Sequence, residues 1–314
     1  MKNLTRKMIT AGMAATMAAS LGIAANAEEA TYKVGICQLI QHEALDAATQ
    51  GFQDALTEKL GDRVEFDVQN ASGESVNCST IINGFVSDQV DLILANATGA
   101  LQAAVAGTSD IPILGTAVTD YATALDIDDW TGTVGGNVSG TSDCAPLDQQ
   151  AAMILELVPE AKTVGMLYCS AEPNSEYQVN VVTEALKELN PDLEIKNYTF
   201  ADSNDISSVA TSATECDVVY IPTDNTAANN TEAINNVMEP AGVPVIAGEA
   251  GICQGCGIAT LSISYYDLGY TTGEMAYEIL EEGADISTME VQYAPNVTKQ
   301  YMADRCEKLG ITVS

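Results

Sequence analysis

The chain has little of what most hydrolytic active sites need. Among its 314 residues there is one histidine, His42, so any nucleophile activated by a histidine has to use this residue. The sequence contains no G-x-S-x-G motif, no G-x-x-x-x-G-K-[ST] motif and no G-x-G-x-x-G motif after the first predicted strand. Acidic residues are so plentiful that no pair stands out as the two carboxylates of a glycosidase. We therefore expect no catalytic residues, no cofactor and no enzymatic activity.

Basic residues are also scarce. There are 12 basic and 44 acidic residues, which gives a net charge of −32. Because such an acidic surface repels nucleic acid phosphates and anionic lipids, we expect no nucleic acid partner. After residue 27 the only arginines are Arg63 and Arg305, which disfavours a multiply anionic ligand held by guanidinium groups. A zwitterionic, neutral or cationic small molecule fits the composition better.

The N-terminus has the order of a secretory signal peptide. Lys2, Arg6 and Lys7 precede an uncharged stretch, and Ala25-Asn-Ala27 forms an A-x-A cleavage pattern. We predict cleavage after Ala27 and export to the periplasm, the cell surface or the medium; a retained membrane anchor is the alternative. No cysteine follows the uncharged stretch closely, so nothing there indicates a lipid anchor. No other apolar run reaches the roughly 20 residues of a membrane-spanning helix.

All eight cysteines follow the predicted cleavage site. An even number of cysteines outside the cytoplasm permits disulfides, and Cys253 and Cys256 are the best candidates because they are closest in sequence. A zinc site needs about four nitrogen or sulfur ligands. With one histidine and no second C-x-x-C motif, we expect no metal. Burial as small apolar side chains is the alternative, above all for Cys216.

Short apolar runs alternate with amphipathic segments along most of the chain. The predicted strands form two sets, residues 34–40, 64–68, 91–95 and 111–115, and then residues 163–168, 193–198, 217–221 and 243–247. Several are nearly continuous in Val, Ile and Leu, which is typical of parallel strands covered on both faces. A helical stripe from Leu45 ends at Gly61, and Ser75 is the expected cap of the next helix.

This alternation predicts two α/β lobes with parallel sheets wound in right-handed βαβ units. The second set starts after a stretch rich in Gly and Ser, residues 132–142, which we interpret as the junction. A helix around Leu268 returns to the first lobe, and a last strand near residues 291–294 crosses back. We predict a signal peptide at residues 1–27, lobe 1 at 28–138 and 265–290, and lobe 2 at 139–264 and 291–314. One doubly wound sheet is the alternative.

Polar residues gather where the predicted strands end, which is where ligands bind in open α/β sheets. Each of them can instead cap the following helix, but their repetition predicts a polar cleft between the lobes. The candidate ligand-binding residues are Gln38, His42, Asn96, Ala97, Thr98, Thr119, Asp120, Ser142, Asp143, Glu172, Asn174, Ser175, Thr223, Asp224, Asn225 and Glu249. Ser175 and Thr98 lie at helix starts, whose free N–H groups also bind carboxylates.

Several segments together resemble one family. They are Val34-Gly-Ile-Cys-Gln-Leu-Ile-Gln-His-Glu-Ala-Leu-Asp46 with Gly51-Phe52, Gly136-Asn-Val-Ser-Gly140, Glu172-Pro-Asn-Ser175, Pro222-Thr-Asp-Asn225 and Ser264-Tyr-Tyr-Asp-Leu-Gly269. From about Tyr32 to about Tyr301 the chain is similar to bacterial ABC-transporter substrate-binding proteins, whose characterised members bind aromatic amino acids, tryptophan in particular. The resemblance implies the type I periplasmic-binding fold, with a hinge between two lobes that close on a ligand. Glu43 departs from the family, which usually has Pro there.

The resemblance implies that a monomer captures an aromatic amino acid and docks on a membrane permease. Glu172, Asp224 or Glu249 is expected to hold the ammonium group, with Ser, Thr, Asn and backbone N–H groups on the carboxylate. The loop at residues 38–42 and Ala97 would frame the side chain, and the ligand would favour the closed lobes. A sugar or a nucleoside is the alternative ligand. Sugar sites use aromatic side chains as platforms. The chain has only one Trp and four Phe, which disfavours a sugar ligand, but its twelve Tyr leave this alternative open.

Overall fold

The computed structural model describes residues 30–313, and the predicted signal peptide, residues 1–27, lies outside them. Two six-stranded sheets organise the described chain. Two sheets exclude the alternative of one doubly wound sheet. Within the described range, no helix has both the length and the apolarity that crossing a bilayer requires.

The first sheet is entirely parallel, with the strand order β11-β5-β4-β3-β1-β2. Every residue of β3, β4 and β5 is buried, as expected for strands covered on both faces. Its strands are β1 (Tyr32–Gln38), β2 (Val64–Asn70), β3 (Leu92–Asn96), β4 (Ile113–Val118), β5 (Val138–Ser142) and β11 (Gln292–Tyr293).

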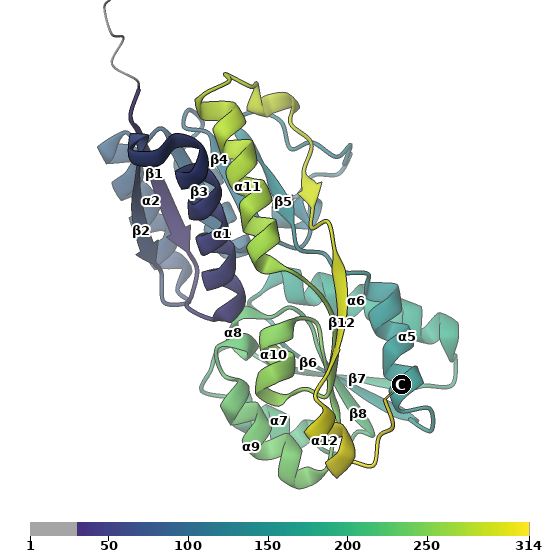
Figure 1. Ribbon diagram of the computed structural model, residues 1–314. Helices are drawn as coiled ribbons and strands as arrows, with labels where there is room; N and C mark the ends of the chain where they lie inside the picture. The colour runs from purple at the N-terminus through teal and green to yellow at the C-terminus, as the bar shows by residue number, and fades with distance from the viewer. Residues whose placement is uncertain (1–29, 314) are drawn as a thin grey trace, which may run out of the picture. The chain divides into compact units, whose positions relative to one another are not determined.

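Helices cover both faces of the first sheet, and each face has its own apolar cluster. The helices are α1 (Glu43–Leu60), α2 (Ser75–Asp88), α3 (Thr98–Gly107), α4 (Tyr121–Ala124) and α11 (Tyr265–Leu280), with short 3-10 turns η1 (Gly61–Arg63) and η2 (Ile286–Thr288). Figure 1 shows α1 and α11 side by side, although they are far apart in sequence. Glycines permit this approach, because a Cβ on Gly269 would lie 1.9 Å from the carbonyl oxygen of Ala48.

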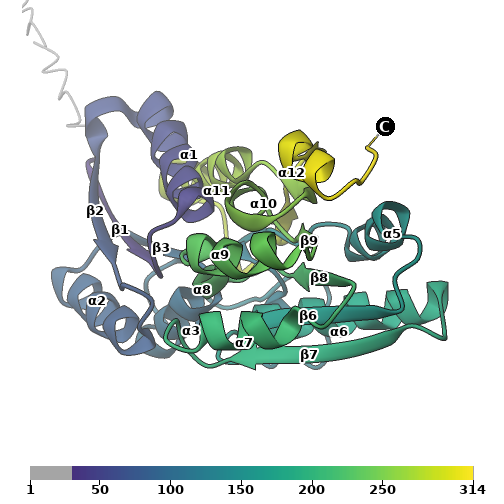
Figure 2. The same ribbon diagram turned by 90° about the horizontal axis from the view of Figure 1, so that it is seen from below.

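The second sheet has the order β12-β10-β9-β8-β6-β7, parallel except for β12, which runs antiparallel to β10. Its strands are β6 (Thr163–Cys169), β7 (Glu194–Phe200), β8 (Val218–Ile221), β9 (Val245–Ala247), β10 (Ala259–Ile263) and β12 (Val297–Tyr301). Its helices are α5 (Leu147–Leu157), α6 (Pro173–Leu189), α7 (Ile206–Ala213), α8 (Asn225–Ala228), α9 (Thr231–Ala241), α10 (Ala250–Cys256) and α12 (Ala303–Lys308). Helices α7, α9 and α10 share one apolar cluster, and α5 and α6 share the other. Figure 2 shows β6 and β7 side by side with these helices around the sheet.

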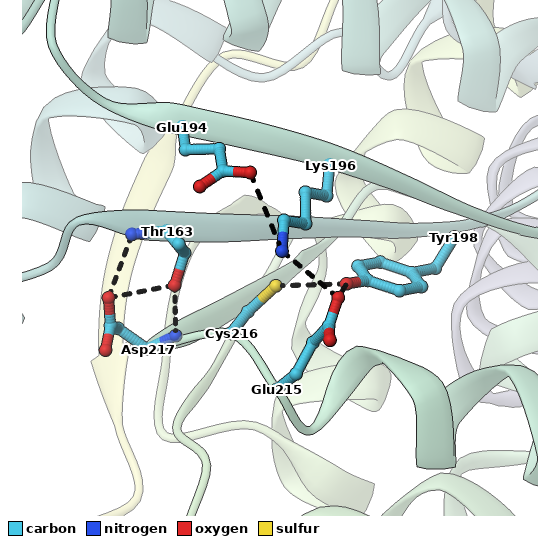
Figure 3. A network of polar contacts seen from close by, with 7 residues as sticks. All are labelled: Thr163, Glu194, Lys196, Tyr198, Glu215, Cys216 and Asp217. Atoms are coloured by element: carbon cyan, nitrogen blue, oxygen red, sulfur yellow. Dashed lines mark hydrogen bonds and ion pairs between the residues drawn. The ribbon is translucent and has the colours of Figure 1, made fainter.

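A polar network stabilises the second sheet away from the strand ends that are expected to bind ligand (Figure 3). Asp217, just before β8, accepts hydrogen bonds from the backbone N–H groups of Lys162 and Thr163, both at 2.8 Å. These bonds lower the pKa of the Asp217 carboxyl. The ammonium group of Lys196, on β7, lies 3.1 Å from the carboxylate of Glu215, which precedes β8. Because Asp217 and Thr163 stand at the amino ends of β8 and β6, this network has a structural role.

All eight predicted strands are confirmed, with bounds shifted by a few residues. The interpretation of residues 132–142 as a junction is wrong in part, because Val138–Ser142 is the buried strand β5 of the first sheet. We did not recognise this strand in the sequence because its residues are small. The packing requires small residues, since a Cβ on Gly140 would lie 2.1 Å from the carbonyl oxygen of Gly115. The predicted last strand exists as β11, but it pairs with β5 of the first sheet. The strand that returns to the second sheet is β12. Residues 139–142 and 292–293, which we assigned to lobe 2, therefore pair with lobe 1.

Two local predictions are corrected. Helix α2 begins at Ser75 itself, and Glu74 occupies the N-cap position without a side-chain hydrogen bond. Cys253 and Cys256 are free thiols, as are the other six cysteines. Both lie within α10, where residues three apart have Cβ atoms about 5–6 Å apart, beyond the roughly 3.8 Å of a disulfide.

Candidate functional site

The predicted site residues lie at the carboxyl ends of the strands and are withdrawn from solvent. Three are half-buried, His42, Asp120 and Thr223. The remaining thirteen are buried: Gln38, Asn96, Ala97, Thr98, Thr119, Ser142, Asp143, Glu172, Asn174, Ser175, Asp224, Asn225 and Glu249. Polar side chains buried in such number need hydrogen-bond partners, and their partners separate them into groups with different roles.

Side chains associated with the first sheet contact side chains associated with the second sheet. Nε2 of His42, before α1, lies 3.1 Å from Oδ1 of Asn225 at the start of α8. Nε2 of Gln178, on α6, donates to Oγ1 of Thr119, after β4, at 3.2 Å. Since the described chain from Thr31 onward forms one compact unit, these contacts mark where the two sets of strand ends meet.

A cavity of about 410 Å³ opens between these strand ends. From the first sheet it is lined by Leu39, Ile40, residues 72–76, Gly99 and Gln102, and from the second by Cys169, residues 171–174, residues 201–203, Asn225, Thr226, Asn229 and Asn230. Its volume lies within the range of about 300–1,000 Å³ that is usual for small-molecule sites. Of the predicted site residues, only Glu172, Asn174 and Asn225 line it.

Beside the cavity lies a group of polar residues that is buried and hydrogen-bonded within itself. Gln178 connects its parts, because its Oε1 accepts from the N–H of Thr223 at 3.0 Å and its Nε2 also donates to the carbonyl of Asn174 at 3.1 Å. Tyr265, at the start of α11, donates its hydroxyl to Oδ2 of Asp143 at 2.8 Å.

Sequence reasoning missed both Gln178 and Tyr265 as site residues. Tyr265 stands inside one of the family-like segments, Ser264 to Gly269, which offered a signal. Gln178 stands beside Val179 on the buried stripe of α6, so it interrupts an apolar pattern with an amide. That interruption was the available signal for Gln178.

Three of the buried carboxylates cap helices. Glu172 accepts from the backbone N–H groups of Asn225 at 2.9 Å and Thr226 at 2.8 Å, and from both of their side chains. Oδ1 of Asp224 accepts from the N–H of Ala227 at 2.7 Å, within the same helix α8. Glu249 accepts from the N–H of Gly251 at 2.7 Å and from that of Ile252. Both oxygens of each carboxylate are engaged within one lobe.

Burial changes the acidity of two of these caps. Burial and the negative charge of Glu172 raise the pKa of Asp224 to about 8, against the hydrogen bonds from Cys169, Ala227 and Ser175 that lower it. Burial raises the pKa of Glu249 to about 7, although two backbone N–H groups favour its ionised form. Desolvation therefore outweighs the capping bonds at both groups.

Asp143 differs from these caps. Its Oδ2 accepts from Tyr265, but its Oδ1 is buried and has no hydrogen-bond partner among residues 30–313. Burial raises the pKa of Asp143, against the hydrogen bond of Tyr265, which lowers it. A buried carboxylate oxygen without a partner is costly, so this atom is suited to a cationic group that arrives from outside.

Three of the predicted site residues position the backbone around the site. The amide of Gln38 donates to the carbonyl of Ile40 at 2.9 Å and to Asp46 at 2.7 Å, which holds the loop after β1 against α1. The amide of Asn96 donates to the carbonyl of Leu45 at 2.8 Å. Ala97 has a φ of +89°, a strained conformation for alanine that sets the direction in which α3 begins.

Comparisons with known proteins converge on one family. The family model described as ABC transporter substrate binding protein matches residues 33–314. A "Tyrosine-binding protein" from Clostridioides difficile (strain R20291) is 37% identical over 252 residues, which are 79% of this chain and 72% of that protein.

Two solved structures show the same similarity. The ABC domain in complex with L-Trp from Streptococcus pneumonia is 30% identical with a TM-score of 0.86, and the match covers 91% of this chain and 96% of that one. The ligand-free, open structure of CD0873, a substrate binding protein with adhesive properties from Clostridium difficile, is 35% identical with a TM-score of 0.69, covering 90% and 96%.

Proposed function

The chain belongs to the ABC transporter substrate binding protein family and has its two-lobed type I periplasmic-binding fold, and we propose that it binds an aromatic amino acid for import. Substrate-binding proteins of ABC transporters work outside the cytoplasm, and the predicted cleavage after Ala27 fits that location. The ligand class follows from the similar proteins, one named for tyrosine and one bound to L-Trp.

The observation that carries this proposal is the unpaired oxygen of Asp143. Every free aromatic amino acid has an α-ammonium group, and such a group would pair with Oδ1 of Asp143 while Tyr265 holds Oδ2. Glu172, Asp224 and Glu249, to which we first assigned this role, already have both oxygens engaged by backbone N–H groups. We therefore place the ammonium on Asp143.

The carboxylate of the ligand needs hydrogen-bond donors other than arginine. Arg305 donates to carbonyl groups at the end of α10, and Arg63 pairs with Glu281, so both guanidinium groups are engaged away from the cavity. Thr98 is the first residue of α3, and Gly99 beside it lines the cavity. The hydroxyl of Thr98 and the free N–H groups at this helix start are the donors that we assign to the carboxylate.

The aromatic ring fits the apolar part of the cavity wall. Leu39 and Ile40 contribute from the loop after β1, Val76 from α2 and Pro173 from α6. Burial of a large apolar side chain adds about 1.5–3 kcal/mol to binding. With charge-assisted hydrogen bonds of roughly 1.5–3 kcal/mol at each end of the ligand, micromolar affinity, about 8 kcal/mol, is within reach.

We infer that the described conformation is the one with closed lobes. The TM-score is higher with the L-Trp complex, 0.86, than with the ligand-free open structure, 0.69, although the open structure has the higher sequence identity. The contacts of His42 with Asn225 and of Gln178 with Thr119 would open before a ligand enters. We propose that the ligand favours this closed form and that the closed monomer docks on a membrane permease.

Thermal unfolding with a ligand panel tests the proposal. The protein is first unfolded and refolded to remove any bound molecule, and then mixed with each natural amino acid, a set of sugars and a set of nucleosides. A ligand at 100 times its Kd adds about 2.7 kcal/mol, which raises the unfolding midpoint by roughly 5–10 °C. We expect shifts with Tyr, Trp or Phe. Shifts with sugars or nucleosides alone would retain the family and overturn the ligand.

A further inference from the structure

Two buried cysteines of one apolar cluster flank, in sequence, the segments that line the cavity from the first sheet. Cys37 lies on β1 and Cys78 on α2, and both side chains are fully buried in the same apolar cluster. Neither residue belongs to the C-x-x-C pair that the sequence put forward.

The packing of α2 on β1 places these residues opposite each other. Gly35 and Cys37 point to the same face of the sheet, because side chains alternate along a strand. A Cβ on Gly35 would lie 2.6 Å from the ring of Phe85, so Phe85 packs directly over Gly35. Cys78 stands two helical turns before Phe85 on the same buried face of α2, and α2 runs antiparallel to β1. The same register therefore sets Cys78 over Cys37.

Backbone hydrogen bonds fix this register at the start of α2. The N–H of Ala71 donates to the carbonyl of Gln38 at 2.9 Å, and the N–H of Gly73 donates to that of Leu39 at 2.8 Å. The N–H of Cys78 in turn donates to the carbonyl of Glu74 at 3.2 Å. The segment that leads into α2 is thus attached to the two residues directly after Cys37.

The two thiols interact with each other, whereas other thiols have different partners. The proximity of Cys78 raises the pKa of Cys37, which burial raises further, and the proximity of Cys37 lowers the pKa of Cys78. Cys256, by contrast, donates to the carbonyl of Ile252 at 3.4 Å. Among the remaining cysteines, Cys144, Cys169, Cys216 and Cys306 also contact a carbonyl or a hydroxyl group.

We propose that Cys37 and Cys78 form a disulfide when the protein folds outside the cytoplasm. The oxidant is a disulfide, either of a thiol–disulfide oxidoreductase or of a small thiol such as oxidised glutathione. The Cys78 thiolate attacks one sulfur of the oxidant and releases the first thiol, and Cys37 then attacks the sulfur of Cys78 and releases the second. One S–S bond forms and one breaks, and the two cysteine protons end on the two thiols of the reduced oxidant.

The crosslink would fasten one wall of the ligand cavity. The loop that it closes contains Leu39, Ile40 and residues 72–76, which line that cavity from the first sheet. Both ends of the lining segment would be joined through one covalent bond between β1 and α2. This inference depends on an extracytoplasmic location and not on the identity of the ligand.

Refolding under controlled redox conditions tests the disulfide. The purified chain is denatured, reduced and refolded with reduced and oxidised glutathione, then unfolded in N-ethylmaleimide and weighed by mass spectrometry. We expect two labels fewer than the eight thiols of the reduced chain. A digest without reductant should contain one linked pair of peptides, which carry Cys37 and Cys78. The oxidised chain should unfold roughly 5–10 °C higher than the reduced one.

Single variants supply the controls. Cys78→Ala should keep all remaining thiols open to labelling, whereas Cys253→Ala should still lose two of its thiols to the disulfide. The comparison of oxidised and reduced wild-type protein needs no substitution, so the test holds even where a variant does not fold. Eight labels after oxidative refolding, or a linked pair that involves other cysteines, would overturn the proposal.

Discussion

Tyr265 donates its hydroxyl to Oδ2 of Asp143 at 2.8 Å, while Oδ1 of the same carboxylate is buried without a partner in the part of the chain that the structure describes. The two residues are 122 positions apart in the chain. Tyr265 thus orients a carboxylate whose second oxygen remains available, and this arrangement distinguishes Asp143 from the carboxylates that cap helices.

Substitution of Asp143 tests its role in binding. Asp143→Asn removes the negative charge that we assign to the ligand ammonium, and the loss of a charge-assisted hydrogen bond should weaken affinity roughly 10- to 150-fold. Tyr265→Phe should weaken it less, roughly 2- to 10-fold, because Tyr265 only positions the carboxylate. Calorimetric titration with the ligand found in the thermal panel measures both. Asp217→Asn, at the amino end of the second sheet (Figure 3), is the control and should bind like wild type. Unchanged affinity in Asp143→Asn would contradict the assignment.

Glu172→Ala should act on stability. The substitution leaves the N–H groups of Asn225 and Thr226 without an acceptor, and the expected loss is about 2–4 kcal/mol in the free energy of unfolding. Glu176 lies one turn further along α6 and is exposed, so Glu176→Ala should change stability by less than about 0.5 kcal/mol. Denaturant unfolding compares the two variants. Equal effects would show that the cap of α8 adds nothing.

His42 should make ligand affinity depend on pH. Burial lowers the pKa of His42 in the closed form from its usual 6.5, against the hydrogen bond that its Nε2 donates to Oδ1 of Asn225, which raises it. The negative charges of Glu172, Asp46 and Glu43 also raise it. Burial is the largest of these effects, so protonation disfavours the closed form, and affinity should fall as the pH drops below about 6.5.

The variant His42→Gln isolates this effect. It should bind roughly 2- to 10-fold more weakly at neutral pH because one hydrogen bond between the lobes changes. Its affinity should also fall less steeply between pH 7 and pH 5 than that of wild type. Parallel pH profiles for the two proteins would remove His42 as the titrating group.

Glu249 should lower stability as the pH rises. Its folded pKa of about 7 lies above its usual 4.5, so its contribution is fully present below pH 4.5 and is lost as the pH rises to about 7. Glu249→Gln removes this titration, and stability should then decrease less between these two pH values, whatever its absolute level. Urea unfolding at several pH values measures the slope. A slope that matches wild type would count against a buried, titrating Glu249.

Two glycine substitutions should have opposite effects. A Cβ at Gly269 would lie 1.9 Å from the carbonyl oxygen of Ala48, so Gly269→Ala forces α1 and α11 apart and should destabilise the fold by about 1–3 kcal/mol. Gly84, exposed within α2, has no atom within 4 Å of such a Cβ, and Gly84→Ala should stabilise by about 0.5–1 kcal/mol. Thermal unfolding separates them. Two shifts of the same sign would contradict the packing described for α1 and α11.

The roles of the polar residues were predictable only where the partner is close in sequence. Asp224 accepts from Ala227 three positions on, which is the standard N-cap pattern for an aspartate. Glu249 makes the same contact with Ile252, but glutamate is an uncommon cap, so the sequence favoured a ligand role. Glu172 caps a helix 53 residues later, and no local pattern signals that contact.

The sequence by itself determined the α/β class, the eight predicted strands and the family, because apolar periodicity and short motifs are local properties of the chain. Only the tertiary structure decided that Val138–Ser142 pairs with the first sheet, that Cys37 and Cys78 share one buried cluster, and that one oxygen of Asp143 has no partner among the described residues. Hydrogen-bond capacity and packing space are filled by residues from distant parts of the chain. Which groups are satisfied and which remain open is therefore settled only when the two sheets and their helices meet.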